Sequence, residues 1–319
     1  GASTHCEISG VTDYKCKDDA DCLTRIRNIM SKVGDYDKAG FNRETPALPK
    51  KDQKEMYGIL NDKQYEIRDI IERIVDNGEH DEYKELYGQS IVCTYARIDG
   101  WAVGIVANQR KIVKTTGAKT KPSEMQFGGV IYSDSADKAT RFIANCNQKK
   151  IPLVFLQDVT GFMVGSRSEH SGIIKDGAKL VNAVANSVVP KITIIVGNSY
   201  GAGNYAMCGK AYDPRFIYAW PSAKIAVMGG EQAAKTMLQI QVATMKAKGK
   251  EVSVEEEKAL LDQLKNKYEK QTTPYYAAAR LWVDEIIDPI VTRQVISEGI
   301  NASNHQSILS DFKVGVFQV

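Results

Sequence analysis

Apolar residues recur with helical spacing in the first 80 residues and predict two amphipathic helices there. The first helix is expected after the N-cap candidates Asp18 and Asp19. Its apolar positions are Leu23, Ile26, Ile29 and Met30. The second helix is expected to end at Asn77-Gly78, a common helix stop. Its buried face is expected to contain Ile67, Ile70, Ile71 and Ile74. The polar stretch between the two helices has the composition of a linker.

From Ser90 onward the pattern changes to short runs rich in β-branched residues. Two such runs are joined by Asp99-Gly100, a strong hairpin signal, and predict a β-hairpin over 90–108. Strands and helices then alternate. The predicted strands are 130–133, 151–159 and 191–196, and the predicted helices are 135–150 and 171–187. This alternation predicts an α/β fold with a parallel sheet and crossover helices.

The last third of the chain adds a predicted strand pair, a charged helical segment and a closing helix. The strand pair covers 215–220 and 224–230, and the closing helix covers 292–303. Residues 241–270 are strongly charged and predict a solvent-exposed helical excursion, although such an excursion can also form a lid. Gly229 and Gly230 are expected to start a helix.

Composition excludes several classes of protein. The 319 residues are 43% hydrophobic and 25% charged, which is typical of an ordered globular protein. The 42 basic and 39 acidic residues are interspersed, so neither nucleic acid nor an anionic membrane is an expected partner. No stretch approaches the roughly 18 to 20 apolar residues of a membrane span. The six cysteines lack paired spacing and predict reduced thiols in a cytoplasm-like compartment. The four histidines are scattered, so no metal site is expected.

The segment GNSYGAGNYA, residues 197–206, matches a dinucleotide-binding fingerprint in form. Its position argues against that function, because several strands precede it and no carboxylate ends the next strand. A loop with so few side chains also leaves its backbone amides accessible to a ligand oxygen. We therefore predict an oxyanion hole formed by Ala202 and Gly203, with Gly201 beside them. Each such donor is worth on the order of 3 kcal/mol. A tight glycine packing turn is the alternative.

A second glycine loop follows the preceding predicted strand. In TGFMVG, residues 160–165, Gly161 and Gly165 flank Phe162. Ligands of parallel sheets lie at the carboxyl ends of the strands, and both loops occupy that edge. The sequence therefore predicts that the two loops form one site.

Several long motifs, in order, resemble one enzyme family. These are ARIDGWAVGIVANQ, IPLVFLQDVTGFMVG, the run from GIIKDGAKL to VMGGEQAA, and IIDPIVTR. They resemble the C-terminal half of the carboxyltransferase (beta) subunit of biotin-dependent acyl-CoA carboxylases, and within it the methylcrotonyl-CoA and geranyl-CoA branch. The resemblance runs from about Tyr65 to the end of the chain.

The resemblance implies a crotonase- and ClpP-like fold of repeated β-β-α units in a homo-oligomer. It implies carboxyl transfer between carboxybiotin and an acyl-CoA, with biotin carried on a separate carrier domain that also serves a biotin carboxylase subunit. The Ala202 and Gly203 amides would face the biotin ureido oxygen. Gly161, Phe162, Gly165 and Gly201 would line the biotin site, and Tyr205 would shape the acyl pocket. Because the cofactor supplies the base, no titrating side chain is required.

The resemblance also implies an organisation and a cellular location. Residues 1–35 would be the trailing helix of an absent N-terminal acyl-CoA domain, 36–64 a linker, and 65–319 the biotin-side domain. The protein is expected to be cytoplasmic, or in the mitochondrial matrix of a eukaryote, and inactive as this fragment. Two alternatives remain open at this stage: a subunit of a sodium-pumping acyl-CoA decarboxylase, and a non-catalytic assembly subunit.

Overall fold

The computed structural model describes residues 1–34, 37–115, 123–249 and 252–315. The chain divides into two compact units, Gly1–Lys38 and Ala39–Val319. The first unit contains the helices α1 (Ala2–Glu7) and α2 (Asp19–Met30). The predicted N-cap is confirmed, because the Asp18 carboxylate accepts a hydrogen bond of 2.7 Å from the Asp21 amide. The apolar positions of α2 are nevertheless exposed, at 40–61%.

A sheet of eight strands forms the centre of the second unit. Seven strands lie in the order β1-β2-β3-β7-β9-β10-β12, and β11 also pairs with β9. The predicted hairpin is confirmed: β2 and β3 are antiparallel, and Ile98 faces Trp101 across the turn. From β3 to β12 all pairs are parallel, as the alternation of strands and helices predicts. The strand bounds are β1 His80–Glu82, β2 Ile91–Ile98, β3 Trp101–Asn108, β7 Leu153–Val159, β9 Lys191–Tyr200, β10 Phe216–Ala219, β11 Lys224–Ala226 and β12 Glu285–Ile286.

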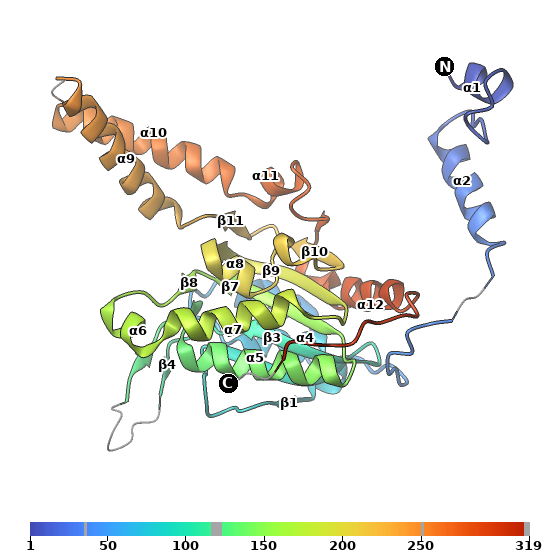
Figure 1. Cartoon of the computed structure of the whole chain (residues 1–319), viewed down its shortest axis with the longest axis horizontal. Coiled ribbons are helices and arrows are strands. Elements are labelled where there is room, and N and C mark those ends of the chain that lie inside the picture. Colours follow the sequence, from blue (N-terminus) through green and yellow to red (C-terminus); the bar gives the residue numbers. More distant parts are fainter. Residues whose placement is uncertain (35–36, 116–122, 250–251, 316–319) are drawn as a thin grey trace. The chain divides into compact units, whose positions relative to one another are not determined.

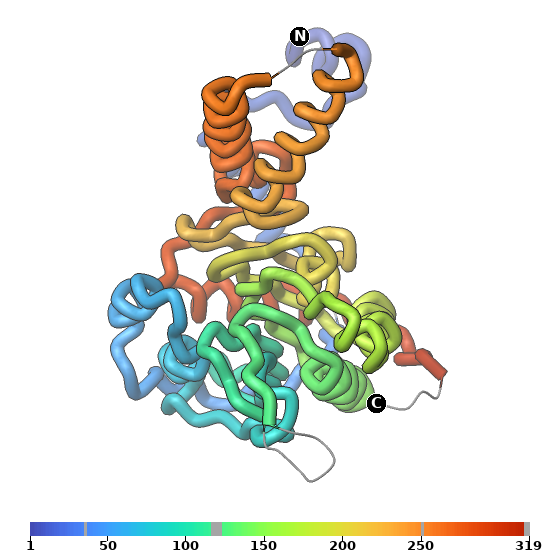
Figure 2. Tube along the Cα trace, turned by 90° about the vertical axis from the view of Figure 1, so that its left-hand side faces the viewer, coloured from blue at the N-terminus to red at the C-terminus, as the bar shows by residue number. Residues whose placement is uncertain are grey.

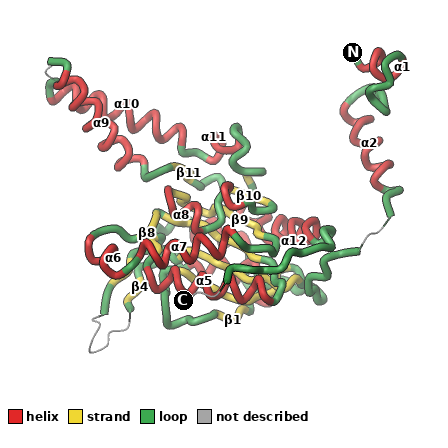
Figure 3. Tube along the Cα trace, viewed as in Figure 1, coloured by secondary structure: helices red, strands yellow, loops and turns green. Residues whose placement is uncertain are grey.

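Helices cover both faces of this sheet (Figure 1). On one face, α5 (Ser133–Gln148) and α7 (Ile173–Ala185) pack over an apolar core that includes Phe142 and Leu180. On the other face, α4 (Ile67–Ile74) and α12 (Thr292–Ser303) pack over a second core. The four isoleucines predicted to form the buried face of α4 are fully buried. The sheet is thus the middle of three layers, as expected for an α/β fold, and Figure 3 shows its strands between the helices.

Two local expectations are wrong. The strands of residues 215–230 do not pair with each other, because β10 and β11 each add in parallel to β9. The strand predicted to end at Val196 continues to Tyr200, so the first part of the glycine loop is sheet. In addition, the stretch with linker composition contributes Phe41 and Met56 to the core, so its polar residues do not keep it away from the sheet.

The described residues of the charged segment are mostly helical, as predicted. It forms most of a hairpin of two helices, α9 (Gly230–Ala247) and α10 (Val254–Gln271), which lie side by side (Figure 2). Gly229 and Gly230 start α9. Few side chains of the hairpin are buried: Ala233, Ala234, Val242 and Leu264.

Short elements complete the unit. The helices are α3 Met56–Ile59, α6 Ser166–Ser171, α8 Gly201–Ala206 and α11 Pro274–Ala278. The strands are β4 Val113–Lys114, β5 Met125–Gln126, β6 Val130–Ile131 and β8 Gly161–Phe162. Among the described helices, none is both long and apolar enough to span a bilayer.

Candidate active site

The two glycine loops meet at the carboxyl edge of the sheet. Gly161 follows β7 and Gly203 lies in α8, which follows β9. A Cβ atom on Gly203 would lie 3.1 Å from the Gly161 Cα and 2.6 Å from a Val159 methyl carbon. The backbones therefore touch only because Gly203 has no side chain. Gly201 makes the turn into α8 with φ of +52°, a conformation that favours glycine.

A cavity of about 650 Å³ opens beside α8. Gly201, Ala202 and Tyr205 line it. Much of the remaining wall is apolar or aromatic and includes Ile217, Ile225, Tyr268, Tyr276 and Trp282. The Tyr200 side chain makes no capping hydrogen bond to the start of α8. The first amides of α8 are thus left without a side-chain acceptor at the edge of this cavity.

Charged groups are scarce in the described cavity wall. Among the described residues of the wall, Lys210 is the only one with a charged side chain. Its ammonium pairs with the Asp284 carboxylate at 3.3 Å. No histidine lines the wall. Among the described residues, no three His, Cys, Asp or Glu side chains group to hold a metal ion. The cavity therefore offers hydrogen-bond donors and apolar surface, and no evident general base of its own.

The other predicted site residues lie in different surroundings. The Phe162 ring is half-buried and packs against α7, where a Cβ on Gly177 would lie 2.8 Å from the ring. Gly165 has φ of +109° and lines a separate cavity of about 400 Å³ with Tyr132 and Arg167. The structure therefore gathers Gly161, Gly201, Ala202, Gly203 and Tyr205 around α8. It places the Phe162 ring in packing and Gly165 at a neighbouring hollow.

A buried carboxylate lies at the end of β7, directly behind the loops. Asp158 is 4% exposed, and its carboxylate accepts a hydrogen bond of 2.8 Å from the Asn198 amide. It also accepts a bond of 2.9 Å from the Tyr65 hydroxyl and pairs with the Arg110 guanidinium at 3.1 Å. Asp158 thus joins β7 and β9 to two other segments of the chain.

This carboxylate occupies a place that a side chain at position 197 would fill. A Cβ on Gly197 would lie 2.4 Å from the Asp158 carboxyl carbon. In the pairing of β7 with β9, Gln157 lies opposite Ile195 and Val159 lies opposite Ser199. More residues of β9 than of β7 lie between these two pairs, so β9 contains a bulge. Bulges redirect the end of a strand. The bulge therefore sets the direction in which β9 enters α8.

Burial raises the pKa of Asp158, and the neighbouring Arg110 guanidinium opposes that shift. Burial and the nearby Asp158 carboxylate raise the pKa of Tyr65 well above its ordinary value. The Tyr65 hydroxyl therefore stays protonated at neutral pH and donates a hydrogen bond to the Asp158 carboxylate. Cys208, beyond α8, is fully buried in the apolar core, and burial raises the pKa of its thiol to about 11. This cysteine is therefore a packing residue.

Sequence reasoning assigned no role to Asp158, Gln157 or Asn198. A signal was present in the strand IPLVFLQDV, where Gln157 and Asp158 follow an apolar run although every residue of β7 is buried. Two consecutive polar residues in a buried strand predict specific partners. Gly197, which directly follows the predicted strand 191–196, was a second signal for a bulge or a close approach of two backbones.

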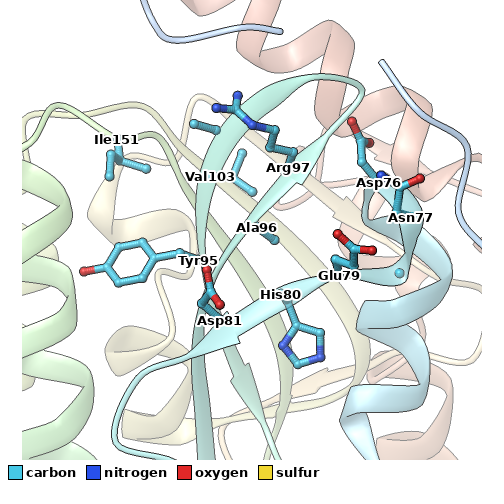
Figure 4. A pocket seen from close by; sticks show the side chains of 12 residues that line it. Asp76, Asn77, Glu79, His80, Asp81, Tyr95, Ala96, Arg97, Val103 and Ile151 are labelled. Atoms are coloured by element: carbon cyan, nitrogen blue, oxygen red, sulfur yellow. The ribbon is translucent and has the colours of Figure 1, made fainter. Parts of the chain in front are cut away.

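A further cavity, of about 670 Å³, lies at the opposite, amino end of the parallel strands and includes Ile151, just before β7. Figure 4 shows Asp76, Asn77 and Glu79 grouped on one side of it, with Tyr95 pointing to the other side. Most of its charged groups already have partners in the chain: Arg293 for Asp76, Lys50 for Glu79 and Glu44 for Arg97. Most charged side chains of this cavity are therefore neutralised within the chain, and the cavity beside α8 is the better candidate for a ligand site.

The chain is similar to known proteins over nearly its whole length. A model of the carboxyl transferase domain family matches residues 1–314. The chain is 44% identical over 314 residues to the mitochondrial methylcrotonoyl-CoA carboxylase beta chain of Dictyostelium discoideum, covering 97% of this chain and 50% of the relative. The chain spans about half the length of the curated relatives it matches.

Solved structures give the same relationship. The geranyl-CoA carboxylase beta subunit of P. aeruginosa superposes with a TM-score of 0.76 at 34% identity, covering 100% of this chain and 57% of that one. The transcarboxylase 12S structure, described as a hexamer assembly, superposes with a TM-score of 0.68 at 34% identity, covering 95% and 55%. The predicted crotonase-like fold and the predicted family are confirmed by these matches.

Proposed function

Because this chain belongs to the carboxyl transferase domain family, we propose that it supplies the biotin-side half of an active site for carboxyl transfer between carboxybiotin and an acyl-CoA. The contact between the two glycine loops carries the proposal. Gly203 lies against Gly161, and this contact holds α8 with its first residues, Gly201 and Ala202, in the wall of a cavity of about 650 Å³. A scaffold protein has no need for such accessible amides, so this feature argues against a purely structural role.

The residues present are compatible with biotin. A bicyclic ureido ring presents a carbonyl oxygen to donors and an apolar body to aromatic side chains. The cavity has both kinds of surface: the start of α8, and the side chains of Tyr268, Tyr276 and Trp282. When bound, carboxybiotin supplies the carboxyl group and the base. In this proposal the Ala202 and Gly203 amides bind the ureido oxygen, and Gly201 keeps the turn narrow.

The chain's own contribution is binding and orientation. Donors fixed before the reaction stabilise developing negative charge without reorganising, and each is worth about 3 kcal/mol. The scarcity of charge in the cavity wall agrees with this division of labour, since the wall contributes no competing base. Gly203 has no side chain and therefore packs directly against Gly161. In this proposal Phe162 and Gly165 border the approach to the site.

Partners and specificity follow from the family. We propose that a biotin carrier domain, charged by a biotin carboxylase subunit, delivers the cofactor, and that an acyl-CoA-binding domain completes the site. Tyr205 is 47% exposed at the cavity wall and would contact the acyl group. Assembly as a homo-oligomer and a location in the cytoplasm, or in a eukaryotic mitochondrial matrix, belong to the same proposal.

The test is a transfer assay with the complete natural polypeptide that contains these residues. Purified protein is incubated with free biotin and a panel of carboxylated acyl-CoA esters, and the CoA products are separated by chromatography. We expect decarboxylation that requires biotin. Ala202→Pro, which removes one amide donor, is expected to abolish turnover, whereas Ala202→Ser is expected to retain it. Lack of biotin-dependent turnover with every ester would overturn the proposal.

A further inference from the structure

A chain of polar side chains runs beneath α8 and connects it to β7 and β9. The Ser199 hydroxyl donates a hydrogen bond of 2.7 Å to the Gln157 side-chain oxygen. It accepts a bond of 2.7 Å from the Asn204 side-chain amide. Gln157 and Ser199 are fully buried, so water does not compete for these bonds. Each of the three residues comes from a different element: β7, β9 and α8.

Gln157 also holds the carboxyl end of α8. Its side-chain nitrogen donates to the Met207 carbonyl at 2.6 Å and more weakly to the Asn204 carbonyl at 3.4 Å. Carbonyl groups only accept hydrogen bonds, so the orientation of the Gln157 amide is unambiguous. Every polar atom of the Gln157 side chain therefore has a partner.

The sequence makes room for this arrangement at Gly209. A Cβ there would lie 1.9 Å from the Asn204 side-chain oxygen, so any larger residue would displace Asn204. The Gly209 amide also donates a bond of 2.7 Å to the Asn204 carbonyl. Asn204 is thus held through both its side chain and its backbone.

We infer that Gln157 is a positioning residue for the proposed carboxyl transfer, acting through Ser199 and Asn204 to fix the Ala202 and Gly203 amides. The inference rests on the proposed function. A six-residue helix is too short to hold its own geometry, because isolated helices of this length are unstable in water. Amide donors must lie about 2.7–3.1 Å from the oxygen they stabilise. Gln157, Ser199 and Asn204 provide the rigid support that α8 lacks.

The first test is Gln157→Met in the complete natural polypeptide. This change keeps the length of the side chain and removes its hydrogen bonds. A displacement of about 1 Å costs on the order of 100-fold in rate, so we expect kcat to fall about 10- to 100-fold. The KM for the acyl-CoA is expected to stay within about twofold, because the altered contacts act on the transition state.

A double variant separates positioning from stability. Replacing both partners of a buried hydrogen bond by apolar groups is nearly neutral for stability. Gln157→Met with Ser199→Ala removes both partners of the Gln157–Ser199 bond but leaves the Met207 carbonyl and the Asn204 side-chain amide unpaired. The double variant is therefore expected to recover part of the stability lost in Gln157→Met, while kcat remains low. Thr292→Val is the matched control. It removes a buried bond of 2.9 Å from the Trp220 indole, outside the cavity wall, and is expected to leave kcat unchanged.

A second measurement does not depend on turnover. The amides of Met207 and Cys208 are hydrogen-bonded to the Gly203 and Tyr205 carbonyls, so their hydrogen exchange reports on the integrity of α8. Exchange at these two amides is expected to accelerate at least tenfold in Gln157→Met, with no change in α5. If Gln157→Met does not fold, Asn204→Ala and Gly209→Ala take its place with the same expectations. A folded variant with wild-type kcat and wild-type exchange at both amides would overturn the inference. An inactive wild-type protein would overturn the proposed function instead, and the exchange measurement would still decide the role of Gln157.

Discussion

Removal of the Asp158 carboxylate is expected to be among the most destabilising single changes at the carboxyl edge of the sheet. In Asp158→Ala the Arg110 guanidinium, whose side chain is 19% exposed, loses its charged partner. The Asn198 amide and the Tyr65 hydroxyl lose their acceptor as well. Removing one partner of a buried ion pair costs about 3–5 kcal/mol. Because Arg110 retains some contact with water, we expect a loss of about 3 kcal/mol in the free energy of unfolding.

The assay is urea unfolding followed by circular dichroism at neutral pH. Asp158→Leu combined with Arg110→Met removes both charges and is expected to cost clearly less than Asp158→Ala, since no unpaired charge remains. Glu231→Gln is the control for a surface ion pair. It breaks an exposed contact with Lys235 and is expected to leave the free energy of unfolding almost unchanged. A loss below about 1 kcal/mol in Asp158→Ala would refute the role assigned to this carboxylate.

Four further outcomes are expected. Ala202→Pro in the complete polypeptide should abolish carboxyl transfer while the far-ultraviolet spectrum and the assembly state stay unchanged; near-normal turnover would contradict the role of the amides. This chain by itself should bind biotin weakly and decarboxylate no acyl-CoA ester, which chromatography of the CoA products checks; appreciable biotin-dependent turnover would mean that the chain contains a complete site. Because burial raises the pKa of Asp158, the folded protein holds that proton more tightly than the unfolded chain, so this group's contribution to stability should fall as pH rises above the ordinary aspartate pKa of about 4; equal pH slopes for wild type and Asp158→Asn in urea unfolding would disprove this. Burial raises the pKa of Cys93 to about 12 and that of Cys208 to about 11, so alkylation of the native protein at pH 8 should label Cys22 and spare these two in mass spectrometry; rapid labelling of Cys208 would contradict its burial.

Periodicity was enough to predict the main layers of the fold. The isoleucine spacing in α4 and the turn residues Asp99-Gly100 are local sequence signals, and the folded protein contains the helix and the hairpin that they predict. The end of β9 was not predictable in the same way. Gly197 and Asn198 disfavour a strand by propensity, but the Asp158 carboxylate and the pairing with β11 keep the chain extended to Tyr200. Tertiary contacts decided this boundary.

The candidate site was also predictable only where a general rule or a local signal applied. The meeting of the two glycine loops followed from the rule that parallel strands end at one edge, and the distance from Gly203 to Gly161 bears this out. The place of the Phe162 ring depended on Gly177, which lies in a separate helix and leaves room for it. The link from Gln157 to Asn204 likewise joins residues whose neighbourhood exists only after the sheet has formed.

The carboxylate of Asp158 has a consequence for the order in which this protein folds. Its partners Tyr65, Arg110 and Asn198 come from widely separated parts of the chain. Each contact requires closure of a long loop, which costs entropy before any bond forms. Hairpins and helices form earlier because their contacts are local. We therefore expect the carboxyl edge of the sheet, with the candidate site, to form after the hairpin and the helices.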